Sequence, residues 1–250
     1  MRRGNRGARP GLIAGSASRV PRADGERGRC QDQNEQAHSA SIDSRAMADE
    51  PDSPLHEEDL DRDPFVQLQR WLAEARDAGV ELPEATTLAT ATRDGSPSAR
   101  MVLLKDAGDG GLTFYTGYES RKGNELAENP RAALVLYWHP FGRQVRVEGS
   151  VERIKPEQSD DYFRSRPLGS RLSAAASRQS EVVSSREELE RAAAELGRRS
   201  GEEVPRPESW GGYRLAPELW EFWQHRLDRL HDRFRYRPGA GDWIIERLAP

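Results

Sequence analysis

Apolar and polar residues alternate in a way that predicts strands early and late in the chain, with helices between them. Asp63-Pro64 is typical of a helix start, and apolar residues follow at helical spacing until Gly79: Phe65, Leu68, Leu72 and Ala75. Short β-branched or apolar runs then predict five strands, at 86–92, 99–105, 112–116, 132–138 and 144–154. Helical spacing returns over 156–197, and three more strands are expected at 219–224, 229–237 and 243–248.

This order of elements predicts the fold class. Strands early, helices in the middle and strands late, without β-α-β alternation, indicate an α+β protein with an antiparallel sheet closed as a small barrel. We expect 132–138 to be buried on both faces. In 144–154, Val145, Val147 and Val151 should face one side of the sheet, and Gln144, Arg146 and Glu148 the other.

The stretch from Ser98 to Asn124 has the composition of a phosphate site. Its first strand carries cations at both ends, Arg100 and Lys105, and the glycine-rich turn 106–111 predicts a hairpin with 112–116. Ser120-Arg121-Lys122 follows where a helix can begin before Pro130 stops it. A serine cap, free backbone N–H groups and two cations suit an anion. The alternative is a surface hairpin followed by an ordinary basic helix start.

Two further clusters could bind an anion. If 229–237 is one strand, Arg229, His231, Arg233, Arg235 and Arg237 share a face. That face could close over an anionic ligand, or it could be a salt-bridged sheet surface involving Asp228 and Asp232. The second cluster consists of Tyr162, Arg166 and Ser170, which are spaced four residues apart and share one helical face if the helix continues past Pro167. These three side chains would suit a phosphate monoester. Alternatively, the tyrosine and the arginine simply pack against each other.

Composition places the chain among water-soluble proteins. Its 250 residues are 35% hydrophobic and 32% charged, with a mean hydropathy of −0.87, and no apolar run approaches the roughly 20 residues that span a bilayer. Cys30 is the single cysteine, so no intrachain disulfide can form. We therefore expect a reducing compartment, a cytoplasmic location and no membrane partner.

Residues 1–46 differ from the rest of the chain. They hold nine arginines against five acidic residues and show no apolar periodicity, so we expect a disordered tail followed by a flexible lead-in over 47–62. The leading interpretation of the tail is an over-extended translation start before Met47. The remaining 47–250 carries 29 cations against 37 acids, about −8 in net charge. That balance argues against a general nucleic-acid binder.

Several sequence signatures are missing. The chain has no GxGxxG, GxxxxGK[ST], HExxH or GxSxG, and its five histidines lack metal-ligand spacing, so we expect no metal. A phosphate must then be held by side-chain cations and hydroxyls.

From Asp63 to Pro250 the chain resembles the pyridoxine/pyridoxamine 5′-phosphate oxidases, an FMN-dependent split-barrel family. Ten motifs in order carry the resemblance: RMVLLK (100–105), FYT (114–116), SRK (120–122), RQVRVEG (143–149), YFRSRP (162–167), RQS (178–180), SWGGYR (209–214), EFWQ (221–224), RLHDRF (229–234) and ERLAP (246–250). The resemblance implies an antiparallel split β-barrel with flanking helices over 63–250. It also implies a homodimer that oxidises pyridoxamine or pyridoxine 5′-phosphate to pyridoxal 5′-phosphate in vitamin B6 biosynthesis, with dioxygen reduced to hydrogen peroxide.

The resemblance also assigns residues. FMN would be held by Arg100, Met101, Val102, Leu103, Leu104, Lys105, Tyr115, Thr116, Arg121, Lys122, Gln144, Gln179 and Ser180, with Trp223 and Arg233 from the other subunit. The substrate phosphate would contact Lys105, Tyr162, Arg166 and Ser170. Arg229 and His231 would cover the pyridine ring and are the candidates for proton handling.

The chain departs from the family pattern in two places. The family reads EFWQGGEHRLHDR where this chain has Gln224-His225-Arg226-Leu227-Asp228 in place of the glycines, so the turn before Arg229 should differ in shape. The segment before the first helix reads His56-Glu57-Glu58-Asp59-Leu60 rather than a basic substrate-covering sequence.

Three other functions fit parts of the sequence. The chain could be a split-barrel flavin oxidoreductase with another substrate, which the presence of Tyr162, Arg166, Ser170, Arg229 and His231 disfavours. It could also carry FMN or pyridoxal phosphate without catalysis, which oxygen-dependent turnover would test. Finally, the arginine-rich tail could bind nucleic acid, and salt-dependent binding lost on removal of 1–46 would show that.

Overall fold

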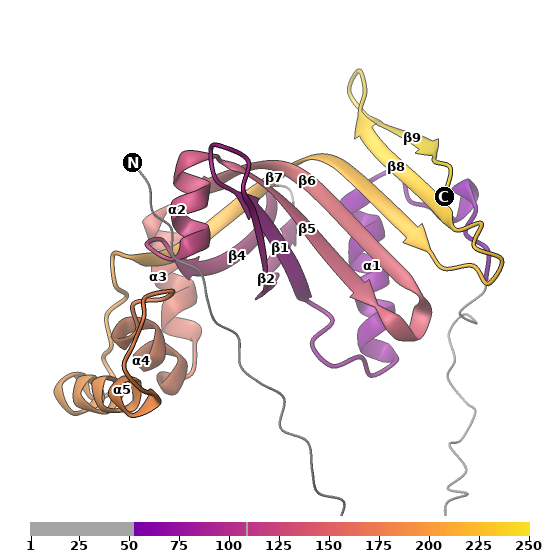
Figure 1. Cartoon of the computed structure of the whole chain (residues 1–250). Helices are drawn as coiled ribbons and strands as arrows, with labels where there is room; N and C mark the ends of the chain where they lie inside the picture. The colour runs from indigo at the N-terminus through magenta and orange to yellow at the C-terminus, as the bar shows by residue number, and fades with distance from the viewer. Residues whose placement is uncertain (1–52, 109) are drawn as a thin grey trace, which may run out of the picture. The chain divides into compact units, whose positions relative to one another are not determined.

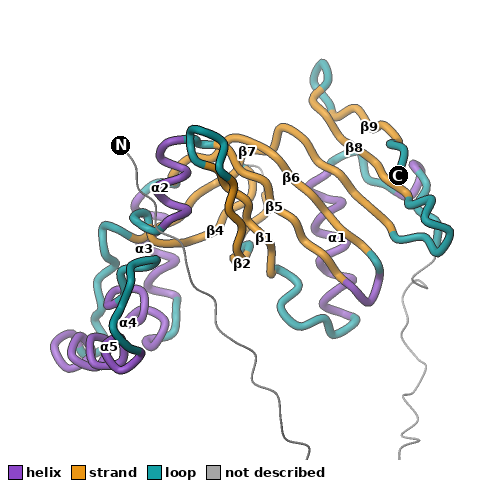
Figure 2. Tube along the Cα trace, in the orientation of Figure 1, coloured by secondary structure: helices purple, strands orange, loops and turns teal. Residues whose placement is uncertain are grey.

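A computed structural model describes residues 53–108 and 110–250 (Figures 1 and 2). The predicted tail 1–46 and the first part of the lead-in, 47–52, lie outside the described residues. Residues 53–62 contain a 3₁₀ turn, η1 (Glu57–Asp59), and bury Leu55 and Leu60 against the core. The backbone N–H of Leu55 donates to a carboxylate oxygen of Asp232 at 3.1 Å, which ties this segment to the C-terminal part of the chain.

Nine strands form one antiparallel sheet in the described residues, in the order β2-β1-β5-β6-β7-β4-β3, with β8 added to β7 and β9 to β8 (Figure 2). The strands are β1 (Ala85–Ala91), β2 (Pro97–Leu103), β3 (Asp106–Gly108), β4 (Gly111–Gly117), β5 (Arg131–Trp138), β6 (Arg143–Arg153), β7 (Trp210–Gln224), β8 (Asp232–Pro238) and β9 (Trp243–Arg247). Five α-helices flank the sheet: α1 (Pro64–Asp77), α2 (Arg121–Glu128), α3 (Pro156–Ser165), α4 (Leu168–Ala176) and α5 (Arg186–Ser200). The curled sheet in Figure 1 confirms the α+β split barrel with flanking helices.

Helix α1 forms as its sequence predicts. Asp63 caps it by accepting a hydrogen bond from the backbone N–H of Phe65 at 2.8 Å, and Leu68, Leu72 and Ala75 are buried on one face. On the same face, Trp71 meets Phe222 edge-to-face with ring centroids 5.2 Å apart. The helix therefore closes one face of the sheet at β7 and carries most of the apolar burial on that side.

Predictions for the two central strands have different outcomes. β6 alternates as expected, with Val145, Val147 and Val151 buried. The prediction that 132–138 is buried on both faces is wrong, because Tyr137 is 53% exposed. Leu136 and Trp138 face the core beside α1, whereas the described chain places no helix over the opposite face of β5.

The predicted pairing of 99–105 with 112–116 is also wrong. β2 pairs along its whole length with β1, from Ala85 opposite Leu103 to Ala91 opposite Pro97. The reason is the tight turn at Gly95, which has a φ of +88° and returns the chain directly onto β1. The hairpin that does form lies between β3 and β4, and β4 pairs on its other side with β7.

The C-terminal strands also differ from expectation. β7 starts at Trp210, nine residues before the predicted 219, and β8 begins only at Asp232. Arg229 has a φ of +68° and lies in the preceding loop, so it does not share a strand face with Arg233. The salt-bridged interpretation holds for Arg235 and Arg237, whose partner is Glu246 on β9 rather than Asp228 or Asp232.

We predict that Gly149→Ala destabilises the fold. β6 shifts register against β7 next to Gly149, and a Cβ there would lie 1.9 Å from the carbonyl oxygen of Ala216. Forcing a methyl group against backbone in a packed region typically costs about 1–3 kcal/mol or more. Urea unfolding of the full chain measures the loss.

Gly169→Ala is the matched control. A Cβ at Gly169 meets no atom within 4 Å, and the residue lies inside α4, where alanine is favoured over glycine by up to about 1 kcal/mol. We expect equal or greater stability for this variant. Equal stability of the Gly149 and Gly169 variants would contradict the steric argument.

Candidate active site

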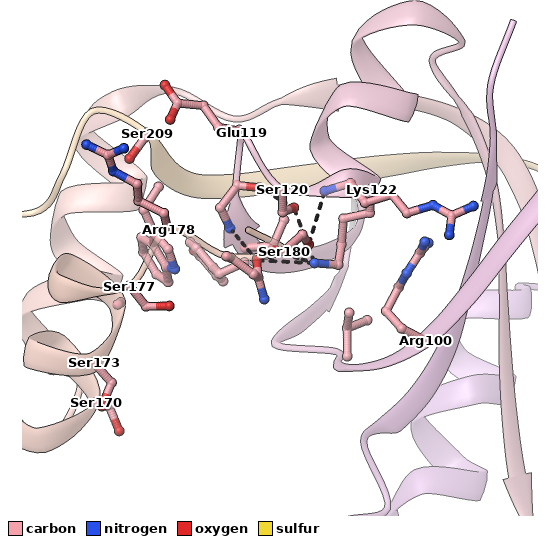
Figure 3. A pocket seen from close by; sticks show the side chains of 18 of the residues that line it. Arg100, Glu119, Ser120, Lys122, Ser170, Ser173, Ser177, Arg178, Ser180 and Ser209 are labelled. Atoms are coloured by element: carbon pink, nitrogen blue, oxygen red, sulfur yellow. Dashed lines mark hydrogen bonds between the residues drawn. The ribbon is translucent and has the colours of Figure 1, made fainter. Parts of the chain in front are cut away.

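A pocket of about 1090 Å³ lies between β2, β4, the start of α2 and the α3–α4 region (Figure 3). Most of the predicted site residues line it: Arg100, Met101, Val102, Leu103, Lys105, Tyr115, Thr116, Arg121, Lys122, Tyr162, Arg166, Ser170, Gln179 and Ser180. Leu104 does not line it, because its side chain is only 3% exposed and belongs to the core. Figure 3 shows Arg100 and Lys122 on one side of the pocket and Ser170 and Ser173 on the other.

The start of α2 is shaped for an anion. Ser120 is the N-cap, and its hydroxyl accepts from the backbone N–H of Gly123 at 3.3 Å while donating to the carbonyl of Gly117 at 2.6 Å. The next backbone N–H, that of Arg121, donates to the Ser180 hydroxyl at 3.2 Å. The sequence prediction of a serine-capped helix start is therefore confirmed, and this helix end borders the pocket.

Lys122 is a buried cation in the pocket wall. It is 6% exposed, and its ammonium donates to the hydroxyls of Thr116 at 3.0 Å and Ser120 at 3.3 Å and to the amide oxygen of Gln179 at 3.2 Å. Burial and, to a smaller extent, the nearby charge of Arg100 lower the pKa of Lys122 to about 8, against the opposing effect of Glu125. Within the described residues Lys122 has no ion pair, so no carboxylate neutralises its charge directly.

Glu125 fixes the two arginines of this wall, and sequence reasoning missed it. Its carboxylate is 3% exposed and accepts from Arg121 Nε at 2.9 Å, from Arg100 Nη2 at 3.3 Å and from the hydroxyls of Ser98 and Thr90. Burial by itself raises the pKa of Glu125, but these hydrogen bonds and the arginine charges lower it to about 2. The i, i+4 spacing from Arg121 is the one sequence signal that could have identified it.

The opposite end of the pocket is aromatic and cationic. Tyr115 stacks on Tyr162 with centroids 3.8 Å apart, and both lie nearly parallel to Trp210. The guanidinium carbon of Arg166 lies 4.8 Å from the Trp210 ring centroid, and its Nη1 is buried without a hydrogen-bond partner. Burial lowers the pKa of Arg166.

Tyr162, Arg166 and Ser170 all line the pocket, but the helix does not continue past Pro167, so they do not share one helical face. Helix α3 ends at Ser165 and α4 begins at Leu168. Pro167 lacks a backbone N–H and excludes Arg166 from helical geometry, which accounts for the break. Tyr162, Arg166 and Ser170 line the same pocket because α3, the break after it and α4 all border that pocket.

A second, smaller pocket of about 250 Å³ is lined by the remaining predicted residues Gln144, Trp223, His231 and Arg233, together with Arg146, Glu221 and Pro250. It shares no lining residue with the first pocket, and Arg229 lines neither. Glu221 is 3% exposed and pairs with Arg233 at 2.8 Å and with Arg146 at 2.7 Å. Arg233 also donates to the carbonyl of Ala249 at 2.9 Å, so the C-terminal residues hold it from the other side.

His231 is fixed in this second pocket by its ring contacts. Its Nδ1 accepts a hydrogen bond from the backbone N–H of Arg226 at 3.0 Å, and its ring lies 4.7 Å from Trp223 and 5.2 Å from His225. Burial lowers the pKa of His231, and the charges of His225 and Arg229 lower it further. The neutral imidazole therefore carries its proton on Nε2.

In residues 53–108 and 110–250, no helix combines the length and apolar character needed to cross a membrane. The same residues contain no group of three or more His, Cys, Asp or Glu side chains that could hold a metal ion.

Two family models match the chain. One, described as pyridoxamine 5′-phosphate oxidase, matches residues 72–199, and the other, described as the pyridoxine 5′-phosphate oxidase C-terminal dimerisation region, matches 210–250. The second match covers β7, β8 and β9, and the matched region 210–250 contributes five of the seven residues that line the second pocket.

Curated relatives and solved structures agree with these matches. The pyridoxine/pyridoxamine 5′-phosphate oxidase of Bordetella petrii is 55% identical over 199 residues, covering 79% of this chain and 94% of the relative. That of Salinibacter ruber is 55% identical over 194 residues, covering 75% and 89%.

Among solved structures, PhzG from Burkholderia lata, in complex with tetrahydrophenazine-1-carboxylic acid, is 37% identical with a TM-score of 0.75, covering 80% of this chain and 100% of that one. A pyridoxamine 5′-phosphate oxidase-related, FMN-binding protein from Nostoc punctiforme is 16% identical with a TM-score of 0.60, covers 76% and 100%, and supports the fold alone. Since one family model spans half of the chain and curated relatives of that name match most of it, this chain belongs to the pyridoxine/pyridoxamine 5′-phosphate oxidase family of oxidoreductases.

Proposed function

We propose that this chain uses FMN to oxidise pyridoxamine 5′-phosphate or pyridoxine 5′-phosphate to pyridoxal 5′-phosphate, with dioxygen as acceptor and hydrogen peroxide as product. The observation that carries the proposal is that two separate groups of cationic and hydroxyl side chains line one pocket, and each group could bind a phosphate. A flavin mononucleotide and a phosphorylated vitamer each need one such group. A cytoplasmic location belongs to the same proposal.

The residues around α2 fit the phosphate of FMN. Lys122, Arg100 and Arg121 supply three positive charges, and the Ser120 cap and the helix N-terminus supply hydrogen-bond donors. Lys122 in particular is a buried ammonium whose pKa is lowered and whose neighbours are neutral oxygens, which is the environment that an incoming phosphate dianion would stabilise. Met101 to Leu103 of β2, with Gln179 and Ser180, would lie along the rest of the cofactor.

The residues around α3 and α4 fit the phosphate of the substrate. Lys105 and Arg166 supply the charges, and Tyr162 and Ser170 supply hydroxyls. The buried and unpartnered Nη1 of Arg166 supports this assignment, because an unsatisfied guanidinium N–H is costly unless a ligand pairs with it.

FMN, when bound, supplies the acceptor for the hydride equivalent that leaves the C4′ carbon of the substrate. The contribution of the chain is to position the two ligands. Neutral His231 would offer its Nε2–H to the pyridine ring or its substituents, and Arg229 would cover the ring with a cation. No strong general base is needed from the chain.

These last two residues lie outside the main pocket of their own chain, which supports a homodimer. The region 210–250, which contains them, matches a dimerisation region. We propose that Trp223, Arg229, His231 and Arg233 of one subunit complete the pocket of its partner. Gln144, which lines the same second pocket, would reach the flavin by the same route.

The strongest rival is a split-barrel flavin oxidoreductase with another substrate, since PhzG was solved in complex with tetrahydrophenazine-1-carboxylic acid, which carries no phosphate. The second group of cationic and hydroxyl side chains in the pocket, around α3 and α4, favours a phosphorylated substrate instead. The other rival is a non-catalytic carrier of FMN or pyridoxal phosphate.

The direct test is turnover. We expect purified protein to carry about one FMN per chain, because the three cations near α2 share a single carboxylate, Glu125, and the remaining positive charge would pair with a phosphate. It should consume oxygen and form hydrogen peroxide with pyridoxamine 5′-phosphate. A protein that takes up no FMN contradicts the proposal, and a flavin-loaded protein that does not turn over is a carrier.

The affinity for FMN should fall as the pH rises above about 8. In the flavin-free protein Lys122 has a pKa of about 8, below its usual value, so it becomes neutral above that pH, and the phosphate dianion binds the charged form. Binding then takes up a proton, and the dissociation constant should rise by up to tenfold per pH unit, measured by flavin fluorescence between pH 7 and 9.5. Riboflavin, which lacks the phosphate, and the Lys122→Met variant are the controls, and both should lose this pH dependence.

Variants of Arg229 and Arg233 should show different defects, one in substrate use and the other in FMN binding. A lost charged hydrogen bond to a bound group costs about 10- to 150-fold. Arg229→Leu should therefore lower kcat/KM for pyridoxamine 5′-phosphate by that order while the protein stays yellow, whereas Arg233→Leu should mainly weaken FMN retention. Flavin loss from the Arg229 variant, with a pure substrate defect in the Arg233 variant, would reverse the assignment.

Mixing two inactive variants tests whether the site is shared. If Arg166 and Arg229 come from different subunits, a heterodimer of Arg166→Leu and Arg229→Leu chains has one intact site. Random subunit exchange makes about half of the dimers heterodimers, and each heterodimer has one intact site of two, so about a quarter of all sites should regain activity. The control is each variant mixed with itself, and failure to regain activity after proven subunit exchange would place both residues in one subunit's site.

A further inference from the structure

Arg166 is held in the pocket by aromatic rings. It follows the last residue of α3, and its backbone N–H donates to the carbonyl of Phe163 at 3.2 Å. Its guanidinium carbon lies 4.8 Å from the ring centroid of Trp210 and 5.8 Å from that of Phe163. In the part of the chain that the structure describes, Arg166 forms no ion pair with a carboxylate, and its Nη1 is buried without a partner.

Arg206, which also contacts Trp210, differs from Arg166 in having a carboxylate partner. Arg206 pairs with Asp160 at 2.6 Å and donates to the backbone carbonyl of Trp210 at 2.7 Å, so its donors are taken up by the protein. A carboxylate beside Arg166 would compete in the same way with an incoming phosphate. An aromatic face attracts the cation through its quadrupole without occupying an N–H group.

The Trp210 ring itself is fixed from several sides. It is 8% exposed at the start of β7, where it pairs with Gly117 of β4. Its ring lies 5.6 Å from Tyr115 in a stacked arrangement and 5.1 Å from Phe163 edge-to-face. A ring packed in this way can hold a guanidinium in one place.

We propose that Trp210 is a positioning residue for the substrate phosphate: its ring face holds the Arg166 guanidinium against the pocket and leaves the N–H donors free for the phosphate. This inference rests on the proposed function, because it assumes that Arg166 binds the phosphate of the substrate. Trp210 acts through Arg166 and need not contact the phosphate itself.

The test uses full-length, flavin-loaded protein. Trp210→Leu removes the π face, so KM for pyridoxamine 5′-phosphate and Kd for pyridoxal 5′-phosphate should rise about 2- to 30-fold. Trp210→Phe keeps an aromatic face and should recover part of the loss. Flavin content, kcat and the Kd for unphosphorylated pyridoxal should stay unchanged, which a general loss of structure would not allow. Trp243→Leu, at a partly buried tryptophan of β9, is the matched control and should leave KM unchanged.

A double-mutant cycle tests whether Trp210 acts through Arg166. In an Arg166→Leu background, replacing Trp210 should cause no further rise in KM, because the group that it positions is gone. A rise as large as in the wild-type background overturns the inference, as does an unchanged KM in the single Trp210→Leu variant. If Trp210→Leu does not fold, the same comparison is made with Trp210→Phe.

Failure of the proposed function would look different. In that case Arg166→Leu itself would leave KM for the phosphorylated substrate unchanged. Arg166→Leu is expected to raise KM by about 10- to 150-fold. A large effect of Arg166→Leu without any effect at Trp210 overturns only the positioning role.

Discussion

The main pocket depends on one buried carboxylate. Arg100, Arg121 and Lys122 border the same space, and like charges so close together repel one another. Glu125 accepts hydrogen bonds from both arginines and stays ionised because those bonds and two hydroxyls lower its pKa to about 2. It thereby holds the two guanidiniums at the wall while leaving the Lys122 ammonium without a counter-ion in the described residues.

A buried glutamate between two arginines also occurs in the second pocket, whereas Arg166 has no such carboxylate partner in the described residues. Glu221 is buried between Arg146 and Arg233 in the second pocket, as Glu125 is between two arginines in the first. Arg166, by contrast, lies on the face of Trp210. The three arginines assigned to the cofactor, Arg100, Arg121 and Arg233, are thus anchored by carboxylates, whereas Arg166, assigned to the substrate phosphate, has no carboxylate partner in the described residues. This difference suits a cofactor that remains bound and a substrate that must exchange.

The sequence by itself determined the local elements. Asp63-Pro64 and the apolar face of α1, the alternation of β6 and the Ser120 cap of α2 all follow from interactions between residues close in the chain, so their patterns could be interpreted directly. The α+β class followed from the order of these elements. The role proposed for each site residue came from ordered motifs shared with a family, since spacing alone left a salt-bridged surface as an open alternative.

Only the tertiary structure decided which of these elements meet. β2 pairs with β1 because the Gly95 turn is shorter than the path to β4, and Arg229 leaves the strand because its backbone takes a left-handed φ. Glu125 and Trp210 gave no strong local signal, since their partners come from β1 and β2 in one case and from the break after α3 in the other. Contacts between residues far apart in sequence depend on packing, and no pattern within a short window records them.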